Sequence, residues 1–409
     1  MKFQSTLAVT ATAALAASLI ASCSSSGGGS SDKPDGTASN AGLTKSPYVV
    51  EVITELSSVN PATEAYQGAQ AAAAAVNADG GINGHPLQVK VCDAGGSTDV
   101  AKATACARSL VADKSILAEV GDFQIFADQS NEILKAANVA NIGASPNAQS
   151  ILSSKNAFPL QGSEGAALGI GLADAGAKTI QVAYTNVAQA AAALQFSQLT
   201  VGKARPQAKV TGGIPINLTA TDLSPQVAKG KSSEGVALAM LPAQLSAWLT
   251  AAKSSNATQK LGASASSLLP SELKALGSKA DGVIVVSGLP LVTSSMPGVV
   301  RFRDEMKKYQ PNAALDGITL NGWLSTWAFA QVARTIQGEP TRASVLDAFS
   351  NLTDFNVFGL LPEGFSTTKE FDFPGLGRLF NQYAVEGVVK DGQLVQTSEG
   401  YVPVFAPPA

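Results

Sequence analysis

The chain has 409 residues, of which 45% are hydrophobic and 14% are charged, and its formal net charge at pH 7 is −3. It contains no Lys/Arg run typical of nucleic-acid binding, and beyond residue 22 no uncharged apolar run is long enough to span a bilayer. From residue 43 onward the chain exceeds the roughly 100–200 residues of one domain, so we expect two lobes.

The N-terminus has the pattern of an export signal. Lys2 supplies a positive charge, and the apolar run from Thr6 to Ile20 is too short for a membrane span. The run ends in LIASC, which resembles the lipobox of bacterial lipoproteins, whose cysteine becomes the lipidated first residue. We predict a signal peptide at 1–22 and a lipid anchor on Cys23. The alternative is an ordinary signal peptide in which this cysteine is coincidental.

A Ser/Gly-rich segment follows the lipobox. Residues 23–42 contain almost no large apolar side chain and cannot build a core, so we predict a flexible tether. An irregular part of the folded domain is the alternative. Together, the signal, the lipid anchor and the tether predict a protein of the cell envelope, outside the cytoplasm and attached to the membrane through Cys23.

Strand and helix patterns alternate in the first part of the folded domain. Strands are predicted at Tyr48 to Thr54, Leu87 to Cys92, Ile116 to Gly121 and Val139 to Ala144, with helices at Thr63 to Asn77, Asp99 to Ala112 and Ala127 to Ala137. This order predicts a parallel sheet with helices on both faces.

A second alternating set follows, and then a C-terminal part of mixed character. Strands are predicted at Thr179 to Thr185, Val210 to Ile216, Gly235 to Leu241, Lys260 to Ser264 and Asp281 to Ser287, with helices at Ala188 to Leu199 and Pro242 to Lys253. The C-terminal part reads as helices at Val299 to Tyr309, Gly322 to Ile336 and Arg342 to Phe349, then a strand pair at Leu379 to Val395 turning at Asp391-Gly392. We therefore predict an α/β fold of two doubly wound parallel-sheet lobes, whose ligand crevices face each other.

Two cysteines remain if Cys23 is lipidated. Cys92 ends a strand pattern and Cys106 lies in the following helix pattern, close enough for a disulfide in an oxidising compartment. Two buried thiols or a metal pair are the alternatives. Metal binding needs further ligands, and the surrounding segment has no CxxC motif.

The single histidine limits the possible enzyme chemistry. A Ser-His-Asp or Cys-His arrangement would need His85, which precedes Pro86 in a turn and reads as a surface residue. The glycines at 169–176 lie in a helix pattern and lack the context of a phosphate loop. We therefore predict a protein that is not an enzyme and has no cofactor and no metal.

One long segment resembles a known family. The stretch from Gly68 to Gly121 contains NADGGINGHPL, a strand ending in Cys92-Asp93, an Ala/Arg-rich helix and AEVG. It resembles the first lobe of the leucine/isoleucine/valine-type (type I) periplasmic solute-binding proteins, the receptors of branched-chain amino-acid ABC importers. The resemblance is thin in the second lobe and returns at Asn321 to Ile336. It does not specify the ligand, because relatives carry amino acids, amides, urea and aromatic acids.

The resemblance implies a fold and a function. Three crossovers would join lobe I, at 43–161 plus 288–370, to lobe II, at 162–287 plus 371–409, and the lobes would close about this hinge. The function implied is that of a monomeric, lipid-anchored receptor that captures an amino acid, an amide or a related small organic acid and delivers it to an ABC permease. A ligand-sensing receptor subunit of the same fold, without a transport role, is the alternative.

The resemblance also implies ligand contacts, mostly in loops after the strands of lobe I. The residues expected to bind are Ser57, Ser58, Asn60, Asp122, Phe123, Gln124, Ile125, Ser145 and Asn147 of lobe I, Leu241 and Ser266 of lobe II, and Trp323. Ser and Asn side chains and helix N-termini suit a carboxylate. Helix capping, turn formation or, for Trp323, core packing are the alternatives for the individual residues.

Lobe II departs from the family pattern. Amino-acid binders of this family place an acidic residue in the loop that here reads GASASSLLP, at 262–270. An unpaired ammonium in a closed cleft is costly, so either Asp122 or Glu55 takes the acidic role, or the ligand is not a plain α-amino acid. The wall residues Phe123, Ile125, Met240, Leu241 and Trp323 favour an apolar or aromatic-bearing solute.

Overall fold

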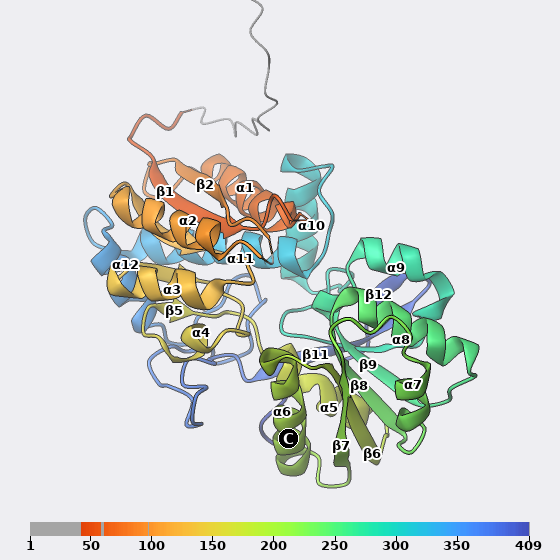
Figure 1. Ribbon diagram of the computed structural model, residues 1–409. Coiled ribbons are helices and arrows are strands. Elements are labelled where there is room, and N and C mark those ends of the chain that lie inside the picture. The colour runs from red at the N-terminus through yellow and green to blue at the C-terminus, as the bar shows by residue number, and fades with distance from the viewer. Residues whose placement is uncertain (1–41, 59–60, 97, 409) are drawn as a thin grey trace, which may run out of the picture. The chain divides into compact units, whose positions relative to one another are not determined.

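The computed structural model describes residues 42–58, 61–96 and 98–408 (Figure 1). The predicted signal peptide, the lipidation site Cys23, nearly all of the tether and the predicted contact Asn60 lie outside these residues. Among the described residues, no helix is both long and apolar enough to cross a membrane.

The first sheet has five parallel strands in the order β2-β1-β3-β4-β5. Its strands are β1 (Tyr48–Thr54), β2 (Leu87–Asp93), β3 (Ile116–Val120), β4 (Ala140–Ile142) and β5 (Ala157–Phe158), connected by α1 (Thr63–Ala78), α2 (Val100–Ala112), α3 (Ala127–Ala136) and α4 (Gln149–Ser153). The strands are rich in buried Val, Ile and Ala, as a sheet covered on both faces requires. The predicted parallel sheet is confirmed; α4 and β5 are too short to show a periodic pattern.

The second sheet is mixed rather than wholly parallel. Its main order is β12-β11-β10-β9-β8-β6-β7, and β13 pairs with β11. Strands β6 (Thr179–Thr185), β7 (Lys209–Ile216), β8 (Gly235–Ala239), β9 (Lys260–Ser264) and β10 (Ile284–Ser287) are parallel, whereas β11 (Tyr383–Lys390), β12 (Gln393–Gln396) and β13 (Val402–Pro403) add antiparallel pairs. The turn at Asp391-Gly392 is present, and both residues have positive φ, as this type of hairpin requires.

Helices cover both faces of the second sheet, and three more belong to the first. The covering helices are α5 (Glu164–Asp174), α6 (Ala188–Ala204), α7 (Ser224–Gly230), α8 (Pro242–Ser254) and α9 (Pro270–Leu276), with two short 3-10 turns at Ala265–Ser267 and Gly277–Lys279. Helices α10 (Pro297–Tyr309), α11 (Gly317–Thr335) and α12 (Arg342–Ser350) pack with α1 or the first sheet. The chain therefore passes three times between the sheets, after β5, after β10 and before β11.

Helices α1 and α11 pack closely against each other (Figure 1). A Cβ atom on Gly68 would lie 2.0 Å from the carbonyl oxygen of Thr319, and one on Gly322 would lie 2.1 Å from that of Ala65. Glycine at both positions lets the helices approach at backbone distance. Helix α11 begins at Gly317, five residues before the predicted start, because Asp316 accepts the Thr319 amide as an N-cap.

The expected disulfide is present. Cys92 of β2 and Cys106 of α2 are bonded, with their Cα atoms 5.7 Å apart. Cys106 is buried together with Ile53 and Leu110 between the sheet and α2. The pair joins a strand to the helix that follows it.

The interpretation of His85 as a surface residue is wrong. It lies in the expected turn, paired with Ile82, but only 7% of its surface is exposed. Its ring stacks on Tyr48 with centroids 4.3 Å apart, and its Nδ1 lies 2.8 Å from the Ser46 carbonyl oxygen. An aromatic neighbour from the start of β1 covers the ring, and the local sequence gave no sign of that contact.

Candidate functional site

A cavity of about 970 Å³ is lined by loops that belong to both sheets. From the first sheet come the loops after β3 and β4 and the start of α11; from the second come the segment after β9, helix α9 and the β11–β12 turn. The passages after β5 and β10 complete the lining. This is the place that parallel α/β sheets offer to ligands, beyond the carboxyl ends of their strands.

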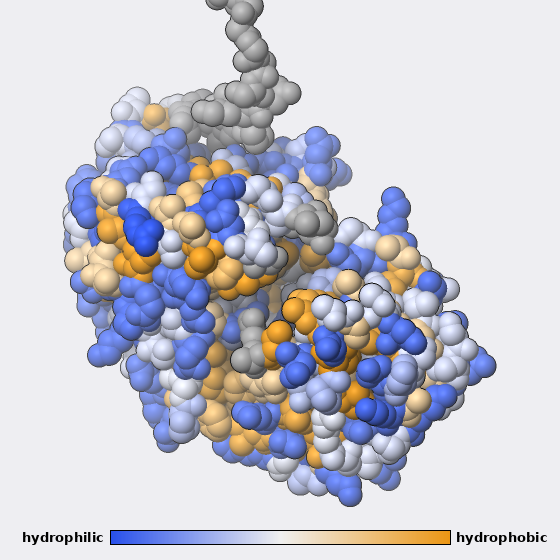
Figure 2. All heavy atoms as spheres, in the orientation of Figure 1, coloured by the Kyte–Doolittle hydropathy of each residue, from blue (hydrophilic) through white to orange (hydrophobic). Residues whose placement is uncertain are grey.

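Five of the predicted contacts line this cavity. They are Asp122 and Phe123 after β3, Ser145 and Asn147 after β4, and Ser266 after β9. The fold thus brings together residues separated by more than a hundred positions in the sequence. Figure 2 shows hydrophobic residues gathered on both sides of the hollowed surface between the two sheets.

Other predicted contacts stabilise the loops beside the cavity. Ser57 donates its hydroxyl to Asp93 over 2.6 Å, and its amide also points to that carboxylate. Burial opposes ionisation of Asp93, but hydrogen bonds from Ser57, Gly95 and Leu56 hold its pKa at about 2. Ser58 packs beside Gly96, where an added Cβ would lie 3.1 Å away. Neither serine is among the lining residues.

Gln124 and Ile125 make hydrogen bonds within and around the loop after β3. The Gln124 amide donates to Asp122, and its oxygen accepts from Ser130. The Ile125 amide donates to Glu55 over 2.8 Å, whereas its side chain is 59% exposed. Glu55 is buried by this loop and does not line the cavity, so Asp122 is the better placed of the two carboxylates considered for a ligand cation.

Trp323 and Leu241 lie away from the cavity. Trp323 is fully buried, packs edge-on against Phe302 and donates its indole N–H to Glu305 over 2.7 Å. Trp323 is therefore a core residue. Core packing was the alternative to ligand contact that the sequence analysis gave for it. Leu241 precedes α8 and is 49% exposed, outside the lining.

Asp122 is the most unusual side chain of the lining. It is 3% exposed; Oδ2 accepts from Gln124 over 3.3 Å, while Oδ1 is buried without a hydrogen-bond partner among the described residues. Burial raises the pKa of Asp122 to about 6, although hydrogen bonds from Gln124 and Ser145 oppose the shift. Burial also raises the pKa of the neighbouring Glu119 well above its usual range. The site therefore contains a buried carboxyl, one oxygen of which lacks a donor among the described residues.

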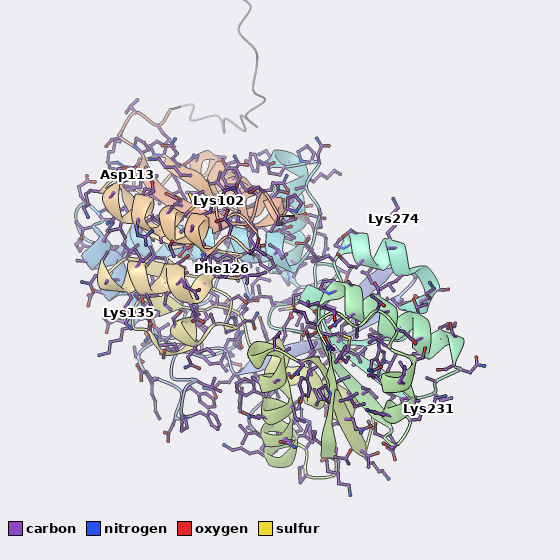
Figure 3. All side chains as sticks on the ribbon, in the orientation of Figure 1. Lys102, Asp113, Phe126, Lys135, Lys231 and Lys274 are labelled. Atoms are coloured by element: carbon purple, nitrogen blue, oxygen red, sulfur yellow. A yellow bond between two sulfur atoms is a disulfide. The ribbon has the colours of Figure 1, made fainter. Side chains whose placement is uncertain are left out.

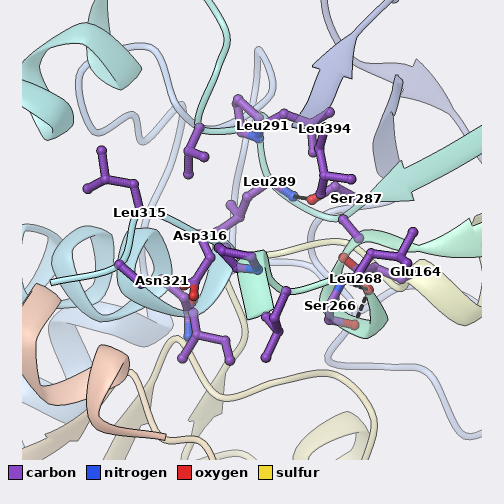
Figure 4. Close-up of a pocket in the computed structure, with 18 of the residues that line it drawn as sticks. Glu164, Ser266, Leu268, Ser287, Leu289, Leu291, Leu315, Asp316, Asn321 and Leu394 are labelled. Carbon is purple, nitrogen blue, oxygen red and sulfur yellow. Dashed lines mark hydrogen bonds between the residues drawn. The ribbon is translucent and has the colours of Figure 1, made fainter. Parts of the chain in front are cut away.

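A second carboxylate, Glu164, was missed in the sequence. It is the first residue of α5 and accepts hydrogen bonds from the hydroxyl and the amide of Ser266 (Figure 4). Ser287 and Gly288 also donate to it, yet burial raises its pKa. The loop at 262–270 thus has an acidic partner after all, supplied by the passage after β5. The only local signal was an acidic residue following the N-cap Ser163, which normally indicates no more than a helix start.

Asn321 is a second buried acceptor in the lining that the sequence analysis did not single out as a contact. Its Nδ2 donates to the Gly143 carbonyl oxygen over 2.8 Å, and its Oδ1 is buried without a partner among the described residues. Gly143 lies just before Ser145, whose amide reaches Asp122. The unpaired oxygens of Asn321 and Asp122 therefore lie beside the same short segment. We call Asp122, Ser145, Asn147 and Asn321 the polar end of the cavity.

The lining combines polar and apolar side chains. Within the described ranges, no group of three or more His, Cys, Asp and Glu side chains is arranged to hold a metal ion. Carboxyl, amide and hydroxyl groups stand beside many leucines. A few fixed polar groups in a mostly apolar wall are typical of a small-molecule binding site.

This fold and this site agree with the comparison to known families. The family model described as periplasmic binding protein matches residues 52–385, so the chain belongs to that family. Members of this family bind solutes rather than catalyse reactions, and they act outside the cytoplasm. No curated protein sequence matches the chain.

Solved structures share the fold at low sequence identity. A substrate-binding periplasmic protein from Ralstonia solanacearum has a TM-score of 0.69 at 18% identity, covering 86% of this chain and 99% of its own. A leucine-binding protein from Thermotoga maritima has a TM-score of 0.68 at 14% identity, covering 86% and 97%. A fatty acid ABC transporter substrate-binding protein from Thermomonospora curvata has a TM-score of 0.69 at 18% identity, covering 90% and 96%. Their different ligands show that the fold alone does not specify the solute.

Proposed function

We propose that this protein is the extracytoplasmic solute receptor of an ABC importer. It captures an amino acid, an amide or a related small organic acid and delivers it to a permease in the membrane. The observation that carries the proposal is the cavity in which Asp122 of the first sheet and Ser266 of the second stand together. In the proposed division, lobe I is 43–161 plus 288–370, and lobe II is 162–287 plus 371–409.

Binding begins in this proposal at the polar end. Ser145 and Asn147 line the cavity after β4, and Asp122 and Asn321 each have a buried acceptor without a partner among the described residues. A solute held there by lobe I then attracts Ser266 and Glu164, which belong to the other side of the cavity. Closing expels water, which strengthens each polar contact and favours the closed form. The permease recognises that form.

The three passages supply the hinge. The Gly162 amide donates to the Gly288 carbonyl oxygen over 3.0 Å, and the Asn381 side chain donates to Leu160 and Gly288. A Cβ atom on Gly162 would lie 2.0 Å from the Tyr383 carbonyl oxygen. The strands of the hinge therefore touch at backbone distance, and rotation about this narrow bundle can move one lobe against the other.

A ligand screen tests the proposal. The whole chain, expressed with Cys23→Ala to omit the lipid, is screened by thermal shift against amino acids, amides and aromatic acids. A ligand at 100 times its Kd stabilises the folded state by about 2.7 kcal/mol, which raises the Tm measurably. The same ligand should compact the protein in solution scattering. A broad screen without any shift would contradict the receptor function.

Lipid anchoring is tested separately. We propose that Cys23 carries the lipid, so wild-type protein should sediment with membranes, and Cys23→Ala should release it into the soluble fraction. Cys92→Ala serves as the control for loss of a cysteine, because its partner is Cys106 and not a lipid. Unchanged membrane retention of Cys23→Ala would count against the anchor without affecting the ligand screen.

A further inference from the structure

The cavity is also lined by leucines from segments far apart in the sequence. We call the group Leu269, Leu273, Leu289, Leu291, Leu315 and Leu394 the apolar chamber. They come from the start of α9, the passage after β10, the residue before the α11 N-cap, and β12. Figure 4 shows Leu315, Leu289, Leu291 and Leu394 around one space, with Glu164 and Ser266 at another side.

Several of these leucines remain in contact with solvent. Leu315 is 37% exposed, and Leu269 and Leu394 are only half-buried. Apolar side chains gathered in a concave wall gain free energy when a hydrocarbon displaces the water that covers them. An amino acid held at the polar end would leave most of a cavity of about 970 Å³ unfilled. The chamber therefore fits a solute with a longer apolar part.

The polar end indicates the head group of such a solute. Asp122 Oδ1 and Asn321 Oδ1 are both buried acceptors that lack a donor among the described residues. A buried acceptor without a partner is unfavourable, and a ligand N–H group removes that cost. Asn321 lies on α11 close to Leu315, so a head at Asn321 directs its chain toward the chamber.

The lining contains two basic side chains, Lys274 and Arg303. Lys274 projects outward from α9 (Figure 3). Arg303 uses Nη1 to donate to the carbonyl oxygens of Val292 and Ser294, both over 2.7 Å. Arg303 lies on α10, and these two bonds hold its Nη1 against the loop that precedes the helix. A carboxylate head at the polar end would lie beside the ionised Asp122, whose like charge disfavours it.

We propose that the site takes an amphipathic solute, with an ammonium or amide head at Asp122 and Asn321 and a hydrocarbon chain in the apolar chamber. This proposal rests on the proposed receptor function and narrows its ligand class. Such a site differs from one for short amino acids in one measurable respect. Its affinity should depend on the length of the ligand's hydrocarbon chain.

The experiment measures the Kd of homologous probes by calorimetry on the whole chain carrying Cys23→Ala. Straight-chain primary amines, amides and carboxylates of four to ten carbons are compared below their micellar concentrations. Each added methylene should lower the Kd of the amines and amides about fourfold until the chamber is full. Carboxylates of equal length should bind at least tenfold more weakly than the amines.

Matched leucine variants test where the hydrocarbon chain of the probe lies. Leu315→Ser and Leu269→Ser should flatten the dependence on chain length and leave the Kd of the shortest amine within about twofold. Leu218→Ser is the control, since Leu218 is 55% exposed and lies outside the cavity. Equal flattening in all three variants would mean non-specific binding and overturn the proposal.

The possible failures are distinguishable. Short amines that bind with no gain from longer chains would overturn the chamber as a binding site and leave the receptor function intact; the leucines would then meet one another on closure. Tighter binding of carboxylates would overturn the assigned head group. If the metabolite screen yields ligands but no member of the three series binds, the amphipathic class is wrong. If neither experiment finds a ligand, the receptor function itself fails.

Discussion

The polar end and the apolar chamber of the cavity are built in different ways. The polar end lies at the carboxyl ends of β3 and β4, where the backbone order of a parallel sheet dictates that loops meet. The chamber is assembled from a helix start, a passage between the sheets and a hairpin, which meet only in the folded chain. The first end holds buried groups with unmet hydrogen bonds, and the second holds partly exposed apolar groups. The polar end thus favours orientation of the ligand, and the apolar chamber favours affinity.

Trp323→Ala tests where the cavity ends and the core begins. The side chain is fully buried against Phe302 and Trp327, so its loss should cost roughly 3–5 kcal/mol of unfolding free energy. Ligand affinity of the protein that still folds should change little, because the residue is outside the lining. Urea unfolding and calorimetry check the two expectations. A large loss of affinity with unchanged stability would place Trp323 in the site.

Replacing both Cys92 and Cys106 by serine tests whether the disulfide affects stability without affecting ligand affinity. Since the pair closes a loop with a sequence separation of 14 residues, its loss should cost about 3 kcal/mol. Affinity should stay within about twofold, because neither cysteine lines the cavity. Urea unfolding under oxidising and reducing conditions provides the comparison. Equal stability of wild type and variant under oxidising conditions would contradict the structural role.

Asp122→Asn should stabilise the empty protein at neutral pH while weakening the binding of an ammonium. The folded-state pKa of about 6 lies above the unfolded value, so the contribution of the neutral carboxyl is complete below pH ~4 and is lost as the pH rises through 6. Over this rise in pH the wild type therefore loses up to roughly 3 kcal/mol of unfolding free energy, and the variant does not. Unfolding at pH 4 and pH 8 measures this difference.

The same substitution has a binding signature. An ammonium favours the ionised Asp122, so wild-type affinity for amines should fall as the pH decreases through about 6, and the variant should show no such step. Asp281→Asn is the matched control, because Asp281 is exposed and precedes β10. Identical pH profiles for wild type and Asp122→Asn would remove Asp122 from the site.

Ser266→Ala should have the smallest effect. It removes one of several donors to Glu164, which keeps its hydrogen bonds from Ser287 and Gly288. We expect a two- to tenfold loss of affinity, the range of one hydrogen bond worth roughly 0.5–1.5 kcal/mol. Ser271→Ala, on the neighbouring α9 and outside the lining, is the control. A greater loss than for Asp122→Asn would mean that the second lobe dominates orientation.

The sequence predicted the polar end better than the chamber because strand ends are local features. Asp122, Ser145 and Asn147 follow β-branched or apolar runs, and those runs indicated the loops in which they lie. Glu164 was missed because a glutamate after a serine N-cap resembles an ordinary helix start. Leu315 was missed because the pattern of α11 was read from Gly322, whereas its N-cap is Asp316. A leucine in a short connection belongs to no periodic pattern, so the sequence does not indicate that it lines a cavity.

By itself, the sequence determined the α/β architecture, the position of most strands and helices and the hairpin at Asp391-Gly392, and it favoured the pairing of Cys92 with Cys106, since each depends on periodicity, turn chemistry or short spacing. Only the tertiary structure decided that Trp323 and His85 are buried, that Glu164 reaches Ser266, and that the acceptors of Asp122 and Asn321 lie beside one segment. These facts arise from contacts between distant segments, where packing and desolvation, and not local preference, set the free energy.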